Sequence, residues 1–212
     1  MKNPNNVIVL THPLLKHKIS MMRDKNTGTA AFRGLVEELT LLMAYEALAS
    51  LPTELVEVDT PLEKCMTPMI SGRKLCVVPI LRAGLGMAEG IVRLVPSARI
   101  GHIGMYRDPE THRPVEYYCK LPEHLDERMI LVVDPMLATG GSAVDAVSAI
   151  KAHGGKNIKL LNIIAAPEGV ETFNNAHPDV PVYIGNIDRG MNENKYILPG
   201  LGDAGDRIFG TK

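Results

Sequence analysis

The sequence predicts an α/β fold with a doubly wound, mostly parallel sheet, flanking helices and a small irregular C-terminal hood. Short and nearly continuous apolar segments at 75–80, 129–133 and 160–166 are typical of strands covered on both faces, as in a parallel sheet. Segments with helical periodicity lie between several of them, and this alternation is typical of doubly wound domains. The residues from about 183 to 212 are rich in Gly, Asn and Asp and have little helical periodicity, so we expect the compact hood there.

The N-terminal part is expected to contain one short strand and two helices. Residues 7–10 are apolar enough for a strand, and the helices are expected within 14–50. The second helix is the clearer one, because its apolar side chains recur at spacings of three and four residues and so share one face. These side chains are Leu35, Leu39, Leu42, Tyr45 and Ala49, and Pro52 ends the helix.

Strands and helices alternate through the rest of the chain. We expect strands at 75–80, 99–105, 129–133 and 160–166, and helices at 87–95 and 143–153. The polar segment 107–122 contains three prolines and does not fit the alternation, so it is either a flexible arm near the site or an exposed loop or hairpin. Because no repeat or low-complexity linker divides the chain, residues 1–212 are expected to form one domain.

Composition and charge narrow the class of protein. The chain has 212 residues and a net charge of −1, which argues against a nucleic-acid or membrane-surface binder, because those need a basic field. Its three cysteines are odd in number and widely spaced, which favours a reducing compartment over a disulfide framework. No apolar run approaches the ~18 residues of a membrane span, and residues 7–10 are too few for a signal-peptide core. A cytoplasmic location is therefore expected.

The most informative segment runs from the strand at 129–133 into the helix at 143–153. Asp134 ends the strand, and a glycine-containing loop then leads into the helix. Such a loop binds anions well, since free amides and the helix dipole point into it and glycine lets a phosphate approach the backbone. Thr139 and Ser142 add hydroxyl donors, although Ser142 with Asp145 also fits a helix cap. Asp134 cannot bind phosphate itself, and it is placed to accept hydrogen bonds from sugar hydroxyls or to help hold a cation.

This segment resembles the phosphoribosyl-pyrophosphate loop of the type I phosphoribosyltransferases. The general pattern of that family has two adjacent acids before the loop, whereas this chain has Asp134 followed by Pro135, and Ser142 replaces the last threonine. The form found here is characteristic of the family members that act on uracil. Three further segments, 79–87, 104–108 and 196–207, are similar to the same members, so the resemblance spans nearly the whole chain. It implies the type I fold and the conversion of uracil and phosphoribosyl pyrophosphate to UMP and pyrophosphate, a pyrimidine salvage reaction.

The resemblance also implies the residues that bind phosphoribosyl pyrophosphate. Arg82 and Arg107 are expected to contact the pyrophosphate, since guanidinium stays charged and grips oxyanions bidentately; a surface ion pair is the alternative. Asp134 is expected to hold the ribose hydroxyls, and Asp203 is a further candidate contact. Arg107 and Asp203 are the expected catalytic residues. The loop around the 5-phosphate comprises Pro135, Met136, Leu137, Ala138, Thr139, Gly140, Gly141 and Ser142.

Uracil recognition is expected in the hood. In the family, backbone groups read the base, and the matching positions here are Ile197, Gly202, Asp203 and Ala204. Backbone N–H and C=O groups match the uracil edge, whereas cytosine would leave buried groups unpaired. Asp203 is the only ionisable member of this set, so it is expected to orient the base, contact the sugar pyrophosphate or assist with the N1 proton.

Cofactors and partners follow from the same resemblance. Mg²⁺ is expected to bind mainly through the diphosphate of the substrate, with no dedicated protein cage. A homo-oligomer and activation by GTP are further expectations; Arg23 and Arg33 either serve a partner or effector or are ordinary exposed helix residues. Two alternatives stay open. One is a phosphoribosyltransferase for a purine base, and the other is a regulatory protein that keeps the fold and binds nucleotide or RNA.

Overall fold

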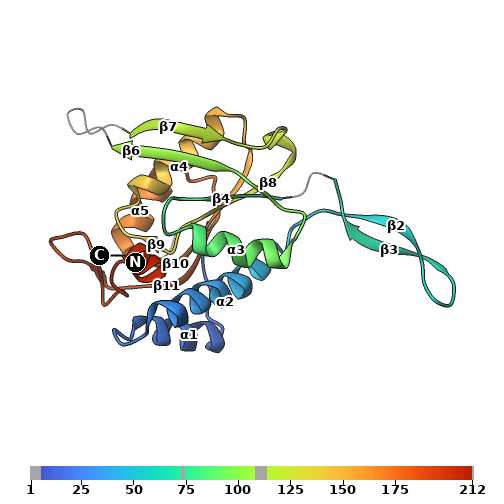
Figure 1. Cartoon of the computed structure of the whole chain (residues 1–212). Helices are drawn as coiled ribbons and strands as arrows, with labels where there is room; N and C mark the ends of the chain where they lie inside the picture. Colours follow the sequence, from blue (N-terminus) through green and yellow to red (C-terminus); the bar gives the residue numbers. More distant parts are fainter. Residues whose placement is uncertain (1–5, 73–74, 108–113, 212) are drawn as a thin grey trace.

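A parallel sheet forms the centre of the molecule (Figure 1). The computed structural model describes residues 6–72, 75–107 and 114–211, and over 105–107 and 114–117 it describes the backbone alone. In order across the sheet, the strands are β1 (Val7–Val9), β11 (Val182–Ile187), β10 (Asn157–Ala165), β8 (Met129–Val133), β4 (Leu75–Pro79) and β5 (Arg99–Ile100), while β9 (Met136–Leu137) pairs with the far end of β10. All of these pairings are parallel, which confirms the predicted fold class.

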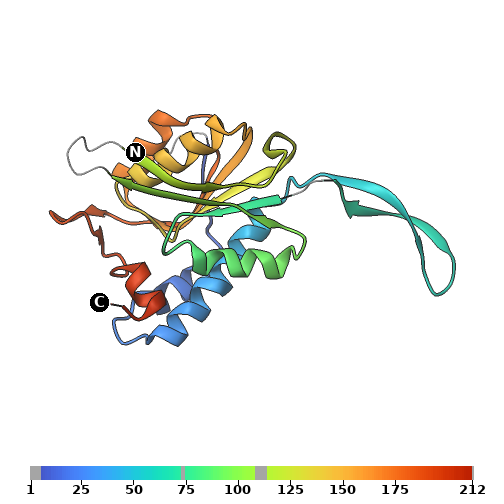
Figure 2. The same cartoon turned by 45° about the horizontal axis from the view of Figure 1, so that its top comes forward.

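Helices cover both faces of this sheet (Figure 2). Side chains along β8 alternate between two hydrophobic clusters, with Leu131 and Val133 facing one and Ile130 and Val132 facing the other. The first cluster lies under the helices α1 (Pro13–Arg23), α2 (Thr29–Ala47), α3 (Leu85–Leu94) and α6 (Ala204–Phe209). The second lies under α4 (Gly141–Ala152), α5 (Pro167–Ala176) and part of the hairpin described below. Burial on both faces explains why the strands read as continuous apolar runs.

The predicted apolar face of α2 is only partly right. Leu35 and Leu39 are buried as expected, but Tyr45 is 72% exposed and Ala49 lies beyond the end of the helix. The buried side of α2 instead continues through Phe32, Val36, Met43 and Ala47. The physical reason is that α2 packs against α1, α3 and the sheet together, so its buried stripe is broad and is rotated away from Tyr45.

Two antiparallel hairpins extend from the sheet. The strand expected at 99–105 divides at Gly101 into β5 and β6 (His102–Arg107), and β6 pairs with β7 (Pro114–Lys120). The segment 107–122 therefore contains a hairpin strand, which is one of the two alternatives that the sequence left open. The other hairpin, β2 (Thr53–Asp59) with β3 (Lys64–Ile70), is not predicted from the sequence and projects far from the body of the molecule (Figures 1 and 2).

The C-terminal hood begins later than the sequence predicts. Residues 182–187 form β11 inside the main sheet, so the part that lies outside the sheet starts at Asp188, and "hood" means residues 188–211 from here on. The hood contains the short antiparallel pair β12 (Gly190–Met191) and β13 (Ile197–Leu198), followed by α6. A 3-10 turn, η1 (Leu125–Glu127), precedes β8. Within the described ranges, none of the helices combines the length and the apolar character that crossing a bilayer requires.

The close contact between β11 and the helices above it gives a test of the packing. A Cβ atom on Gly185 would lie 2.6 Å from the carbonyl oxygen of Ile163 and 3.0 Å from the side chain of Ile19. We expect Gly185→Ala to lower the free energy of unfolding by ~1–3 kcal/mol, because overpacking strains the neighbouring strand.

Urea unfolding measures this effect, and Gly34→Ala is the matched control. No atom lies within 4 Å of a Cβ at Gly34, which is inside α2, so alanine there should stabilise the helix by up to ~1 kcal/mol. Equal stability of the two variants would contradict the packing described for β11.

Candidate functional site

The candidate site lies where the parallel strands end. Pro79 at the end of β4 is paired with Val133 at the end of β8, so the segments that follow these strands emerge side by side. The amide of Ile80 donates to the carbonyl of Val133 at 2.9 Å, and a Cβ atom on Gly84 would lie 2.5 Å from that same oxygen. The turn at 80–84 therefore packs tightly against the end of β8, which brings Arg82 and Asp134 to one edge of the sheet.

Asp134 is held in place through its own backbone. Its amide donates to the carbonyl of Leu161 at 3.2 Å, and Asn162 Nδ2 donates to its carbonyl oxygen at 2.8 Å. The carboxylate accepts from the amide of Met136 at 3.3 Å. Burial raises the pKa of Asp134 to about 7, because the Met136 amide only partly offsets the loss of water around the charge.

Asn162 was not predicted as part of the site. Its side chain is fully buried, and its Oδ1 atom has no hydrogen-bond partner within the described residues. One signal in the sequence was available, since Asn162 is a lone polar residue inside the apolar run at 160–166. A buried amide in a central strand needs a partner, and here that partner is the backbone of Asp134.

The predicted phosphate loop lies beside Asp134. Met136 and Leu137 pair with β10, and α4 begins directly after Gly140, which is in the left-handed region with φ 84°. The N-cap residue of α4 is Gly140 and Ser142 lies inside the helix, so the interpretation of Ser142 as the N-cap is wrong. Thr139 and Ser142 are exposed, with their hydroxyls available at the edge of the sheet. The loop can therefore offer backbone amides, two hydroxyls and the positive end of a helix dipole to an anion.

Helix α5 supports this loop from behind. A Cβ atom on Gly169 would lie 2.6 Å from the carbonyl of Leu137, and one on Gly140 would lie 2.8 Å from the carbonyl of Gly169. On the other side of the loop, Ser142 lines a small cavity of about 70 Å³ together with Ile80 and Leu81. The loop is thus fixed on one side and open on the other.

Arg82 and Asp203 face a common space between the sheet edge and the hood. A Cβ atom on Gly205 would lie 3.2 Å from Asp203 Oδ1 and 3.8 Å from Arg82 Nη2, so the missing side chain at Gly205 keeps this space open. The Arg82 side chain is 61% exposed and pairs with Asp206 Oδ1 at 3.3 Å. Arg107 ends β6, and since only its backbone is described, its predicted pyrophosphate contact lies outside the described part of the chain.

The predicted base-reading residues lie close together in the hood. The side chains of Ile197 and Ala204 are buried, so these two residues can offer only backbone groups. Gly202 has φ 80°, and Asp203 is exposed with its Oδ1 accepting from the Asp206 amide at 2.9 Å as the cap of α6. Asp203 also borders an open groove of about 640 Å³, whose opposite wall is the turn between α1 and α2.

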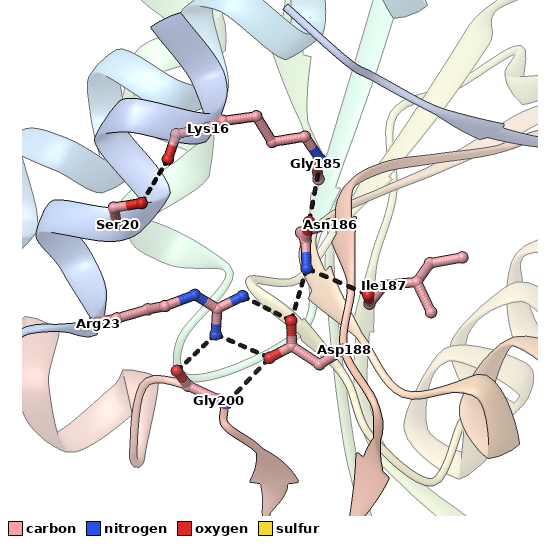
Figure 3. A network of polar contacts seen from close by, with 8 residues as sticks. All are labelled: Lys16, Ser20, Arg23, Gly185, Asn186, Ile187, Asp188 and Gly200. Carbon is pink, nitrogen blue, oxygen red and sulfur yellow. Dashed lines mark hydrogen bonds and ion pairs between the residues drawn. The ribbon is translucent and has the colours of Figure 1, made fainter. Parts of the chain in front are cut away.

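Arg23 and Arg33, for which the sequence left open either a partner or effector or no specific role, hold the hood. Arg33 donates to the carbonyl of Ile208 at 3.0 Å, and Arg23 pairs with Asp188 and also donates to the carbonyl of Gly200 (Figure 3). Asp188 is a further residue that the sequence analysis missed. A third arginine, Arg207, donates to four backbone carbonyls, those of Met22, Leu201, Asp24 and Thr27.

The side chains that could bind a metal ion by themselves lie outside the candidate site. Within the described residues, the one set of three such side chains that reach one another is His124, Asp126 and Glu127, all exposed. They precede β8, at the opposite end of that strand from Asp134. The candidate site itself presents the separate carboxylates of Asp134 and Asp203, which suits a cation that is held mainly by a phosphorylated ligand.

The raised pKa of Asp134 predicts how stability depends on pH. The unfolded state keeps the ordinary pKa near 3.8 and so favours the ionised carboxylate, which means that stability falls as the pH rises from about 4 to about 7. We expect Asp134→Asn to melt at a higher temperature than the parent protein at pH 8, with a gain that shrinks towards pH 5.

Melting temperatures measured from pH 5 to 8 test this expectation. Asp179→Asn is the control, because hydrogen bonding to Lys151 lowers the pKa of Asp179 and its charge therefore favours the folded state. A gain for Asp134→Asn that stays constant across this range would show that the burial of Asp134 does not govern its ionisation.

Comparison with known proteins identifies the family. The model of the uracil phosphoribosyltransferase family matches residues 9–211. A uracil phosphoribosyltransferase from Thermoanaerobacter sp. is 60% identical over 207 residues, which cover 98% of this chain and 99% of that protein. One from Symbiobacterium thermophilum is 60% identical over 206 residues, covering 97% of this chain and 99% of that protein.

Solved structures share the fold. The structure of a protein from Aquifex aeolicus is similar with a TM-score of 0.89 and 38% identity, over 96% of this chain and 97% of that one. The adenine phosphoribosyl transferase of Trypanosoma brucei is similar with a TM-score of 0.57 at 11% identity, over 93% of this chain and 88% of that one. At that identity, the second likeness shows the fold alone.

Proposed function

The chain belongs to the uracil phosphoribosyltransferase family, and we propose that it joins uracil to phosphoribosyl pyrophosphate, with UMP and pyrophosphate as products. One observation in the structure carries this proposal. A half-buried carboxyl, an open anion-binding loop and an exposed arginine meet at the edge of the sheet, and the hood brings Asp203 to the same space. This arrangement matches a substrate with sugar hydroxyls, a phosphate and a diphosphate.

The sugar and its phosphate are assigned to the sheet edge. The 5-phosphate lies in the loop at 135–142, where it accepts hydrogen bonds from backbone amides and from the hydroxyls of Thr139 and Ser142. Asp134 accepts hydrogen bonds from the ribose hydroxyls. Because its pKa is raised to about 7, it is a full acceptor only above that pH. Binding of the substrate should therefore strengthen as the pH rises through 7.

In the reaction, the bond from the anomeric carbon to the pyrophosphate oxygen breaks, and a bond to uracil N1 forms. Positive charge develops on the sugar, while the leaving pyrophosphate takes the electron pair. We assign Arg82 and Arg107 to the stabilisation of that pyrophosphate. Mg²⁺, bound mainly through the diphosphate, would neutralise further charge on the leaving group, and it needs no protein cage. Asp203 uses Oδ1 to cap α6, which leaves Oδ2 for the substrate and the N1 proton.

The base is assigned to the hood. The backbone groups of Ile197, Gly202 and Ala204 present donors and acceptors that a flexible side chain would hold less rigidly. A site of this kind rejects a base whose hydrogen-bonding pattern differs, because its buried polar groups are then left unpaired. Uracil is accordingly favoured over cytosine at this position.

Pyrophosphate release with different bases tests the proposal. The purified protein is mixed with phosphoribosyl pyrophosphate, Mg²⁺ and either uracil, cytosine, hypoxanthine or orotate. We expect release with uracil alone, and a rate lower by at least about tenfold for Arg82→Ala, because a charged contact to the leaving group is lost.

Each other outcome removes a different part of the proposal. Release with a purine would keep the phosphate site but overturn the assignment of the hood to uracil. No release with any base from folded protein would overturn the enzymatic function and favour a regulatory protein that binds nucleotide or RNA. An assay without Mg²⁺ tests the metal, since full activity in excess chelator would contradict its role.

We also propose that the protein is a homo-oligomer assembled through the β2–β3 hairpin. Both faces of this hairpin carry exposed apolar side chains; Leu55 and Met66 share one face and are 66% and 59% exposed. Val56 and Met69 are exposed on the other face, and Leu62 at the tip is 95% exposed. An isolated two-stranded hairpin is marginally stable in water, and open strand edges favour pairing with another chain. A second copy, the commonest partner of soluble proteins, would cover these surfaces.

Mass measurement by light scattering tests the oligomer. We expect at least twice the chain mass of 23.1 kDa for the parent protein, and a shift towards 23.1 kDa for the double variant Leu55→Glu/Met66→Glu. Both side chains are exposed, so the fold of the single chain should be unaffected. Glu54→Gln on the same hairpin is the control, and a parent protein that runs as a monomer would contradict the proposal.

Two smaller parts of the proposal concern regulation and location. GTP is proposed as an activator, and its addition to the uracil assay tests this; an unchanged rate would contradict it. Neither Arg23 nor Arg33 is offered as its site, because both hold the hood. A cytoplasmic location is proposed from the odd number and wide spacing of the cysteines, which favour a reducing compartment.

A further inference from the structure

A buried carboxylate lies directly behind the base-reading part of the hood. Asp188 follows β11, and its side chain is only 1% exposed. Arg23 at the end of α1 forms a two-pronged ion pair with it, with Nη2 at 2.5 Å from Oδ1 and Nη1 at 2.8 Å from Oδ2 (Figure 3). Asn186 Nδ2 donates to Oδ1 at 2.6 Å. Because its carboxylate accepts hydrogen bonds from several charged and polar donors, Asp188 can remain ionised inside the protein.

The ion pair holds the backbone of a single hood residue, Gly200, through the two peptide units that flank it. The amide of Gly200 donates to Asp188 Oδ2 at 2.9 Å, and the carbonyl oxygen of the same residue accepts from Arg23 Nη1 at 2.7 Å. Both polar groups of the Gly200 backbone are therefore used by the Arg23–Asp188 pair (Figure 3). This arrangement fixes the orientation of that residue more strongly than either hydrogen bond would alone.

Gly200 connects the two halves of the predicted base-reading set. It has φ 63°, and its Cα lies against the carbonyl of Ile197, with no room for a side chain. Two residues later the chain reaches Gly202, which also has a positive φ of 80°, and then Asp203 and Ala204. A change in the backbone dihedral angles of Gly200 would therefore move Gly202 and the following residues relative to Ile197.

We propose that the Arg23–Asp188 pair is a positioning element that sets the geometry of the uracil-reading backbone through Gly200. Neither side chain is assigned a contact with the substrate. The inference rests on the proposed function, and it identifies α1, at the opposite end of the chain, as a determinant of base affinity. Backbone groups that read a base cannot adjust their position by a change of side-chain rotamer. Their position therefore depends on the contacts that hold the backbone in place.

The neighbouring side chains show which contact joins the pair to the hood. Lys16 on α1 is one nearby cation, and its Nζ is already used by the carbonyl of Gly185 at 2.8 Å and by Asn186 Oδ1 at 3.0 Å. Arg207 is another, and it donates to the carbonyls of Met22 and Leu201. Lys16 and Asn186 thus brace the end of β11, and Arg23 reaches the hood carbonyl of Gly200.

Steady-state kinetics on Asp188→Asn and Arg23→Lys test the proposal. Asparagine keeps the shape of the side chain but removes the charge, and lysine cannot donate to Gly200 and both carboxylate oxygens in the same fork. We expect the KM for uracil to rise about tenfold in each variant, while the KM for phosphoribosyl pyrophosphate stays within about threefold. The two variants change different members of the pair, so one of them still tests the proposal if the other fails to fold.

Hydrogen exchange provides a readout that needs no substrate. In both variants, amides within 197–204 should exchange faster than in the parent protein, while amides of β8 and β10 exchange at unchanged rates. Arg33→Lys is the matched control, because Arg33 also holds a hood carbonyl, that of Ile208, at the far end of α6. It should leave the KM for uracil unchanged.

The outcomes separate this proposal from the proposed function. If the parent protein fails to turn over uracil, the function is wrong, and exchange at 197–204 still reports whether the pair holds the hood. If uracil is turned over but both KM values rise together, or Arg33→Lys acts like Arg23→Lys, the pair serves stability only and the positioning role is overturned. Unchanged kinetics and exchange in both variants would overturn it as well.

Discussion

The site depends on the parallel pairing of β8 between β4 and β10. Strands that run in the same direction end at the same edge of the sheet, so the loops that follow them lie close together as a result of the pairing alone. Burial of β8 on both faces leaves the next residue, Asp134, at the boundary between core and solvent, and this position raises its pKa to about 7. The anion-binding loop follows because β9 pairs with β10 and α4 must begin at that edge. The pairing of β4, β8, β9 and β10 thereby fixes the carboxylate, the loop and the turn that carries Arg82.

The hood is held in place differently, since little of it belongs to the central sheet. Its shape is set by arginines that donate to backbone carbonyls and by carboxylates that accept from backbone amides. Hydrogen bonds of charged groups are stronger than those between neutral groups, and they add to the packing of Ile197, Leu201, Ala204 and Ile208 in the core. Two of these arginines, Arg23 and Arg33, come from the N-terminal helices. The part that is proposed to read the base is therefore braced by residues that lie far away in the sequence.

Much of the fold could be predicted from the sequence, because apolar runs such as 129–133 record burial directly. The position of Asp134 at the carboxyl end of a strand was also predicted, and the structure places it there beside the turn that carries Arg82. The β2–β3 hairpin escaped prediction because its apolar side chains are exposed in a single chain, so no core imposes a pattern on them. Tyr45 was misplaced because three neighbouring elements share the buried side of α2. Asn162, Asp188 and Arg23 were missed as site residues, since their importance arises from partners that no local pattern reveals.

The position of β1 has a consequence for how the protein is made. This strand is the first described along the chain, yet its partner is β11, and Asn6 donates to the carbonyl of Val180 across 174 residues. Arg23 likewise pairs with Asp188, which lies 165 residues later in the sequence. During synthesis the first strand and first helix emerge early, but their partners are among the last residues to leave the ribosome. Closure of the sheet and assembly of the hood therefore both wait for the C-terminal part of the chain, and a chain that stops before β11 lacks the strand that pairs with β1 and the hood proposed to bind the base.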